Sequence, residues 1–168
     1  RIIVMLHGLA SSPEAWVELA NEILGDEALR QHYQIWQVYY PTNMPVALNH
    51  AMIRRALGET LTHFDPSGQA PASSDLVLVG HSMGGVIARL MVSSTDQSLV
   101  QLAADHSRLT PQQIRRIDPM LRFEPFPNVS SAIFIAAPHR GTSVAGGRLG
   151  RWMAGFIRFP ITVLEELA

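Results

Sequence analysis

One five-residue run constrains the fold of this chain more than any other feature: Gly80-His81-Ser82-Met83-Gly84. It follows the apolar stretch 75–79, which is typical of a strand, and it precedes residues 85–90, which are patterned as a helix. A strand that turns sharply into a helix holds its turn residue in a strained backbone conformation, and it needs residues without side chains where the two elements nearly touch. The two glycines of the run supply that clearance. The sequence therefore predicts a strand–turn–helix unit that exposes Ser82 at the turn.

Four short apolar runs, rich in β-branched and aromatic residues, recur along the chain at residues 2–6, 35–40, 76–79 and 132–135. Near-continuous apolar strands, rather than alternating ones, are typical of a parallel sheet that is covered on both faces. Each run is therefore predicted to be a buried strand. Helical patterns lie between the runs, so we expect an α/β fold with about four mainly parallel strands and helices on both faces.

Clear start and stop signals mark three of these helices. The first covers residues 13–25, with Ser11 or Ser12 as its N-cap and a proline in its opening turn. The second runs from about residue 45 to residue 64, where an Asp-Pro pair ends it. The third is the helix after the serine turn, over residues 84–92. All three are expected to cover the sheet.

The segment between the third helix and the last strand has a different character. Thr110-Pro111-Gln112-Gln113 has the pattern of a capping box, which starts one more helix. We interpret residues 93–127 as a small helical insertion within one domain that covers residues 1–168. The chain also opens inside a predicted strand and without an initiator methionine, which predicts that it is part of a longer protein.

Composition narrows the classes of partner and cofactor. The 168 residues are 47% hydrophobic and 16% charged, which is typical of a globular domain. A formal net charge of −1 offers no basic field for a nucleic-acid backbone, so nucleic acid is excluded as an expected partner. The chain has no cysteine, which rules out disulfides and thiolate metal ligands but leaves the cellular location open.

Ser82 is a candidate nucleophile because of its place at the start of a helix. A helix N-terminus offers backbone N–H groups and a positive dipole end to a developing oxyanion, and the N–H of Met83 is the natural first donor. The run His7-Gly8-Leu9 ends the first predicted strand, where a second donor is required, and the N–H of Leu9 is our candidate. The alternatives are a glycine-rich turn with an incidental serine, and a His7 ring that is satisfied by hydrogen bonds of its loop.

Three ordered motifs carry a family resemblance: His7-Gly8-Leu9, the Ser82 run, and Ala137-Pro138-His139-Arg140-Gly141-Thr142. Together they resemble bacterial triacylglycerol lipases and the related PGAP1-like hydrolases. The resemblance implies an α/β-hydrolase fold and cleavage of carboxylic esters through an acyl-enzyme, with no metal or organic cofactor. It also implies that Ser82 is the nucleophile and that Leu9 and Met83 are the oxyanion donors. It favours an extracytoplasmic or membrane-associated bacterial protein.

A serine hydroxyl needs a histidine to take its proton and a carboxylate to orient that histidine. In this fold the acid and the histidine follow the serine in the chain. His139, at the mouth of the strand beside the serine, is a weak candidate for the base, and His106 is weaker because it lies in the polar insertion. His81 adjoins Ser82 but points to the opposite face of the strand. We therefore expect the base and its carboxylate to lie beyond residue 168. Acids that precede the two downstream histidines or lie between them include Asp96, Asp105 and Asp118.

The last part of the chain is predicted to contain a basic amphipathic helix over residues 148–159, with apolar residues at helical spacing and arginines on the opposite side. It could form a lid over an acyl pocket, rest on a lipid surface, or pack on the sheet as an ordinary surface helix.

The sequence is also compatible with two rival functions. An acyltransferase or a thioesterase would use the same serine machinery, and only the acceptor or leaving group would differ. A non-catalytic binding domain could keep the strand–turn–helix unit without a working triad.

Overall fold

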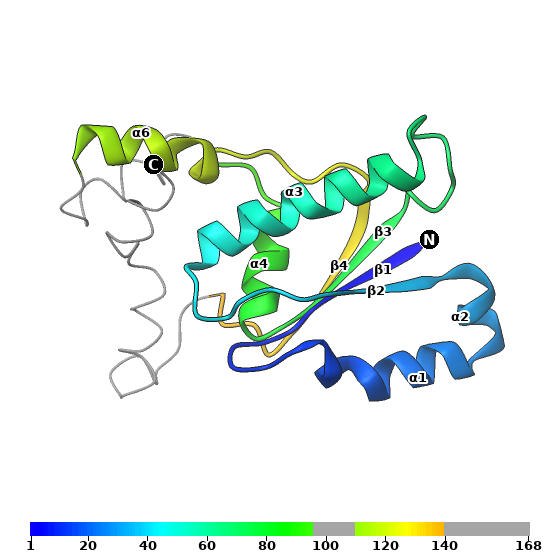
Figure 1. Ribbon diagram of the computed structural model, residues 1–168. Helices are drawn as coiled ribbons and strands as arrows, with labels where there is room; N and C mark the ends of the chain where they lie inside the picture. The colour runs from blue at the N-terminus through cyan, green and yellow to red at the C-terminus, as the bar shows by residue number, and fades with distance from the viewer. Residues whose placement is uncertain (96–109, 140–168) are drawn as a thin grey trace.

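A four-stranded parallel sheet forms the centre of the computed structural model, which describes residues 1–95 and 110–139. The strands are β1 (Ile2–Leu6), β2 (Gln34–Val38), β3 (Leu76–His81) and β4 (Val129–Ile135), and their order in the sheet is β2-β1-β3-β4 (Figure 1). All three neighbouring pairs are parallel. The four strands predicted from the apolar runs are confirmed.

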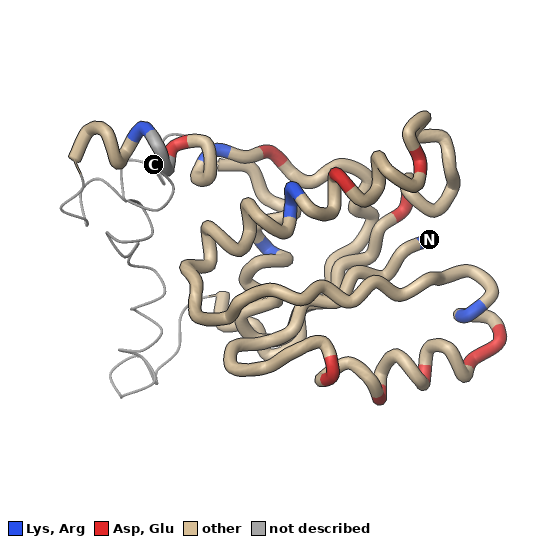
Figure 2. Tube along the Cα trace, viewed as in Figure 1, with Lys and Arg blue, Asp and Glu red and all other residues tan. Residues whose placement is uncertain are grey.

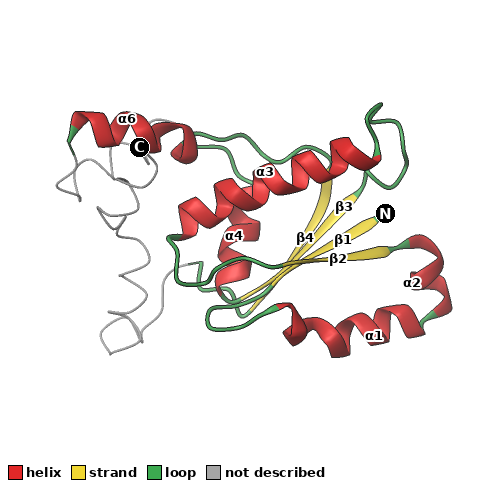
Figure 3. Ribbon diagram, viewed as in Figure 1, coloured by secondary structure: helices red, strands yellow, loops and turns green. Residues whose placement is uncertain are grey.

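Helices cover both faces of this sheet, as predicted. The 3₁₀ turn η1 and helices α1 and α2 lie on one side, and α3 and α4 lie on the other (Figure 3). Helix α6 contacts α3. The bounds are η1 (Pro13–Trp16), α1 (Val17–Gly25), α2 (Glu27–His32), α3 (Val46–Phe64), α4 (Met83–Met91) and α6 (Pro111–Leu121).

The connection between β1 and β2 differs from the prediction in two ways. The first predicted helix begins as the separate 3₁₀ turn η1, and Ser12 occupies its N-cap position without a side-chain capping bond. Helix α2 was missed. Its N-cap is Asp26, whose carboxylate accepts a hydrogen bond from Leu29 N at 2.9 Å. None of its residues is buried, so it has no apolar stripe from which periodicity could reveal it.

Elsewhere the start and stop signals work as predicted. Helix α3 begins right after Pro45 and ends at Phe64, and the capping box of α6 forms in full. In that box Thr110 accepts from Gln113 N, and the Gln113 side chain accepts from Thr110 N. The described part of the 93–127 segment therefore contains one helix, whereas residues 96–109 lie outside the described residues.

Strand β1 explains how the two-sided core forms. Ile2, Val4 and Leu6 belong to a cluster with the residues of α3 and α4, whereas Ile3 and Met5 pack in a second cluster with Trp16 of η1. Successive side chains of a strand point to opposite faces, so both faces of β1 must be apolar. Burying each large side chain contributes roughly 1.5–3 kcal/mol.

The prediction that all four strands are buried is wrong for the two outer strands. In β2 none of the five residues is fully buried, and in β4 the side chains of Ile133 and Ile135 are 51% and 39% exposed. Both strands pair on one side only within the described sheet. Apolar composition alone does not distinguish an outer strand from a central one.

Charge is distributed unevenly over the two helical layers. Acidic side chains follow one another along η1, α1 and α2, whereas Arg54 and Arg55 of α3 lie on the opposite side of the sheet (Figure 2). In the part of the chain that the structure describes, no helix combines the length and the apolar character that a membrane span requires. The predicted 148–159 helix lies outside the described residues.

Candidate active site

Ser82 occupies the turn between β3 and α4 in a strained backbone conformation. Its φ is 52° and its ψ is −117°, so it lies in the positive-φ region that side chains disfavour. Its N–H donates to the carbonyl of Ile135 at 2.9 Å, and its own carbonyl accepts from Gly85 N at 3.0 Å. The backbone of the serine is therefore held from both sides. Its hydroxyl makes no hydrogen bond to any other described residue.

Close backbone approach explains the glycines of the turn. A Cβ atom on Gly80 would come within 2.6 Å of the Gly84 carbonyl carbon, and one on Gly84 would come within 2.5 Å of the His7 oxygen. Real Cβ atoms do not approach backbone atoms so closely. The predicted clearance role of both glycines is confirmed. Gly85 adds a third contact of this kind, since its Cβ would lie 2.5 Å from that of Ala137.

The loop after β1 lies directly beside the serine. A Cβ atom on Gly8 would sit 3.3 Å from Ser82 Cβ and 2.9 Å from His81 Nδ1. Strands β1 and β3 are parallel neighbours, so their carboxyl ends meet at one edge of the sheet. Among the described residues, neither the Leu9 amide nor the Met83 amide has a hydrogen-bond acceptor. Within the described residues, both N–H groups are therefore without a hydrogen-bond partner.

His7 agrees only in part with the alternative of a ring that its own loop satisfies, because Nε2 is buried without a hydrogen-bond partner in the described structure. The side chain is fully buried, and Nδ1 lies 3.0 Å from the carbonyl oxygen of Gly8. Its ring stacks on Tyr40, with the ring centroids 4.2 Å apart. The hydroxyl of Tyr40 donates to the His7 carbonyl, which immediately precedes the Gly8 turn. Burial raises the pKa of Tyr40, so the phenol remains a donor at neutral pH.

Tyr40 was not identified as a site residue from the sequence. It stands two residues after β2 and is 3% exposed, so it resembles an ordinary core residue. A signal does exist, because a buried tyrosine hydroxyl requires a partner. The adjacent carboxyl end of β1 offers the His7 carbonyl, but that pairing depends on the strand order.

No described histidine forms a hydrogen bond with the hydroxyl of Ser82. The ring of His139 packs edge-on against Phe134, with centroids 4.8 Å apart, and the side chain is exposed. His81 is also exposed. Neither ring has a hydrogen bond to Ser82 in the described part of the chain.

Of the acidic candidates, only Asp118 lies within the described residues. Asp118 forms an ion pair at 2.7 Å with Arg122, the C-cap of α6, and has no described hydrogen bond to a histidine. His106, Asp96 and Asp105 lie outside the described residues. Across residues 1–95 and 110–139, no three histidine or acidic side chains gather in the manner of a metal site.

Comparison with known proteins agrees with this geometry. The sequence matches the alpha/beta hydrolase family over residues 3–167. Among solved structures, the lipase BlEst2 of Bacillus licheniformis in its mature form is 21% identical, with a TM-score of 0.51 over 89% of this chain. Esterase B from Lactobacillus rhamnosis is 12% identical, with a TM-score of 0.53 over 92% of this chain.

The chain spans 46% and 43% of the length of these two structures, respectively. No curated protein sequence matches it. At such low identity the structural likeness shows the fold alone. The sequence match, by contrast, covers nearly every residue, and the chain therefore belongs to the alpha/beta hydrolase family.

Proposed function

We propose that this protein hydrolyses carboxylic esters and that Ser82 is its nucleophile. The observation that carries the proposal is the strained backbone of Ser82 on the β3–α4 turn, with a hydroxyl that no described residue binds. A folded chain retains such a conformation only where surrounding contacts impose it, and strained residues cluster at active sites. The lipase and esterase named above have the same fold, which supports this reaction class.

The proposed reaction proceeds in two steps. Ser82 Oγ attacks the ester carbonyl and its proton passes to a general base, while the Leu9 and Met83 amides donate to the oxyanion. Collapse of the tetrahedral intermediate expels the alcohol, which takes the proton from the base, and leaves an acyl-enzyme. A water molecule then attacks the acyl carbon, and the carboxylic acid leaves as Ser82 regains its proton.

The general base is proposed to come from outside the described residues. Ser82 Oγ has no histidine partner among residues 1–95 and 110–139, and the fold places the acid and the histidine after the serine in the chain. His139, just beyond β4, is the alternative base, but its ring would have to leave Phe134 to reach the serine.

The finer assignment is to the bacterial triacylglycerol lipase and PGAP1-like branch, and it rests on the three sequence motifs. Two of them meet at the serine edge, and the third begins directly after β4, with its last three residues outside the described part. On this proposal the substrate is a lipid-like ester. Residues 93–127 would then be an insertion within a single domain.

A fluorophosphonate probe tests the nucleophile directly. We expect it to label the full-length protein and to fail on Ser82→Ala, because only an activated serine reacts with the probe. Ser74→Ala is the matched control, since the Ser74 hydroxyl is exposed and only donates to Pro71. Equal labelling of Ser82→Ala and the wild type would contradict the assignment, as would an unlabelled wild type.

A further inference from the structure

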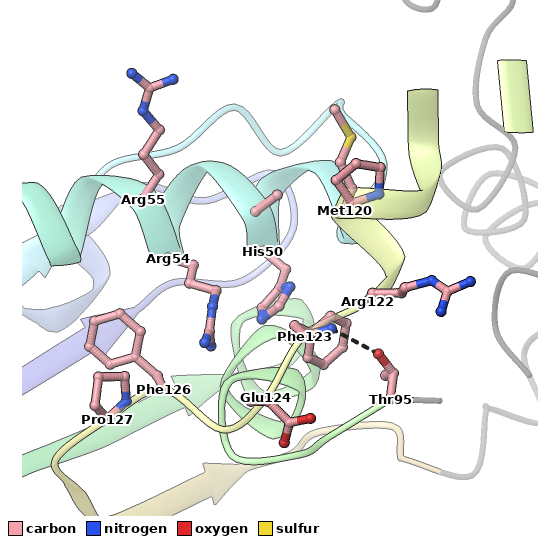
Figure 4. Close-up of a pocket in the computed structure, with 12 residues that line it drawn as sticks. His50, Arg54, Arg55, Thr95, Met120, Arg122, Phe123, Glu124, Phe126 and Pro127 are labelled. Atoms are coloured by element: carbon pink, nitrogen blue, oxygen red, sulfur yellow. Dashed lines mark hydrogen bonds between the residues drawn. The ribbon is translucent and has the colours of Figure 1, made fainter. Parts of the chain in front are cut away.

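A second candidate site lies at the other end of α4. A cavity of about 850 Å³ opens between α3, α6 and the segment that leads into β4 (Figure 4). The amide of Phe126, in its wall, donates to Met91 at the C-terminal end of α4 at 2.7 Å. Ser82 begins the same helix, whose nine residues span about 13 Å. The cavity is therefore separate from the serine edge.

The first unexplained group in this cavity is His50 of α3. The side chain is 1% exposed, and neither ring nitrogen has a hydrogen-bond partner in the described structure. Its ring lies 4.3 Å from the ring of Phe123 and points into the space below α3 (Figure 4). Burial, with the nearby charge of Arg54, lowers the pKa of His50 to about 4. At neutral pH the ring thus offers one donor and one acceptor, both unused.

The second unexplained group is Arg54, one helical turn further along. Its Nη1 is buried and has no described partner, and its guanidinium carbon lies 5.4 Å from the centre of the Phe126 ring. Residues four apart share one face of a helix, so His50 and Arg54 point into the cavity together (Figure 4). A buried polar group without a partner costs about 1–3 kcal/mol, and more when it is charged.

The remaining charges around the cavity explain why Arg54 is distinctive. Arg55 belongs to the lining, but its guanidinium points away from the other lining side chains (Figure 4). It pairs with Glu59, and Arg122 pairs with Asp118. Burial lowers the pKa of Arg54 and the negative charge of Glu124 opposes this shift, but no ion pair within 4 Å joins the two residues in the described structure. Within the described lining, Arg54 is the cation without a bonded anion.

We propose that this cavity binds a small monocarboxylate with an aromatic or other apolar body. Its carboxylate accepts hydrogen bonds from Arg54 Nη1 and from the His50 ring, and its apolar part lies against Phe123 and Phe126. Two hydrogen-bond donors beside aromatic walls match the chemistry of such a ligand. The cavity volume lies in the usual range for ligand sites. The Glu124 carboxylate disfavours a dianion such as phosphate. This proposal does not depend on the function of Ser82.

The experiment is a ligand titration of the full chain carrying Ser82→Ala, which separates the result from the proposed catalytic site. The probes are phenylacetate, its neutral analogue phenylacetamide and inorganic phosphate, and the readout is the NMR signal of the His50 ring. We expect a saturable shift with phenylacetate, and binding weaker by roughly tenfold or more for the other two. Equal binding of phenylacetate and phenylacetamide, tighter binding of phosphate, or no saturable shift would overturn the proposal.

Three variants locate the ligand. Arg54→Gln should weaken phenylacetate binding by roughly tenfold or more, whereas Arg55→Gln, the adjacent arginine that points away, should change it less than about twofold. Glu124→Gln removes a like charge and should tighten binding, so it tests the site even where Arg54→Gln fails to fold. Unchanged binding in a folded Arg54→Gln, or weaker binding in Glu124→Gln, would overturn the assignment.

Discussion

The two ends of α4 are built in opposite ways. At the N-terminal end, backbone meets backbone, with Gly80 and Gly84 packed so closely that no Cβ fits. At the C-terminal end a cavity opens, and its character comes from two polar side chains on α3, His50 and Arg54. The N-terminal end is therefore sensitive to any added side-chain atom, and the C-terminal end is sensitive to replacement of its polar side chains. Four substitutions test this difference.

Gly84→Ala should have the largest effect. The new Cβ would meet the carbonyl oxygens of Leu6 and His7, and neither backbone group can move without disturbing the end of β1. We expect a loss of about 3 kcal/mol or more in the free energy of unfolding, measured by urea denaturation. Gly58→Ala is the control, because nothing lies within 4 Å of its Cβ, and it should stabilise α3 by about 0.5–1 kcal/mol.

At the C-terminal end of α4, His50→Gln should change how the free energy of unfolding depends on pH. The pKa of His50 is about 4 in the folded chain and 6.5 ordinarily, so the unfolded chain binds the proton more tightly. Stability should fall as pH drops from about 6.5 to 4, by roughly 3 kcal/mol, and His50 should have no effect above that window.

In His50→Gln the loss of stability between pH 6.5 and 4 should disappear. Asp65 titrates lower, because hydrogen bonds from Ser73 and neighbouring amides lower its pKa to about 2, and its contribution is lost only below about pH 4. Denaturation curves at pH 7, 5.5 and 4 separate the two residues. An unchanged slope between pH 6.5 and 4 would show that His50 is not the group that titrates.

Near the N-terminal end of α4, Tyr40→Phe should destabilise the protein less than Gly84→Ala does. It leaves the His7 carbonyl without its donor, which should cost roughly 1–2 kcal/mol of stability. If that bond holds the Gly8 turn beside Ser82, fluorophosphonate labelling should also slow. Tyr39→Phe is the control, because that side chain is 77% exposed. Labelling at the wild-type rate in Tyr40→Phe would limit Tyr40 to a purely structural role.

Ser82→Gly should have the smallest effect and the opposite sign. Glycine accepts a φ of 52° without strain, so Ser82→Gly should be about 0.5 kcal/mol more stable than Ser82→Ala. At Ser131, which pairs with Val77 in strand β4, the same pair should show the reverse order, with alanine more stable. Thermal unfolding of all four variants measures both differences.

Prediction from sequence was most successful where local signals decide the structure. Start and stop residues place α3 and α6, and apolar runs place the four strands. It missed α2, since that helix buries no residue, and it assigned burial wrongly to β2 and β4. At the serine edge it identified the Gly8 loop and the serine turn, but not Tyr40. The proposed roles of Leu9, Ser82 and Met83 remain predictions.

The sequence by itself determined the turn at Ser82, because a serine between two glycines, after a strand and before a helix, has few other ways to fold. The strand order β2-β1-β3-β4 was decided only by the tertiary structure, and with it the meeting of Gly8 with Ser82 and of Tyr40 with His7. The cavity of His50 and Arg54 was decided there too, since it needs α3, α6 and the segment before β4 in one place. Local patterns specify which backbone conformations are sterically allowed. Only packing decides which distant groups face each other and which buried polar groups are left without a hydrogen-bond partner.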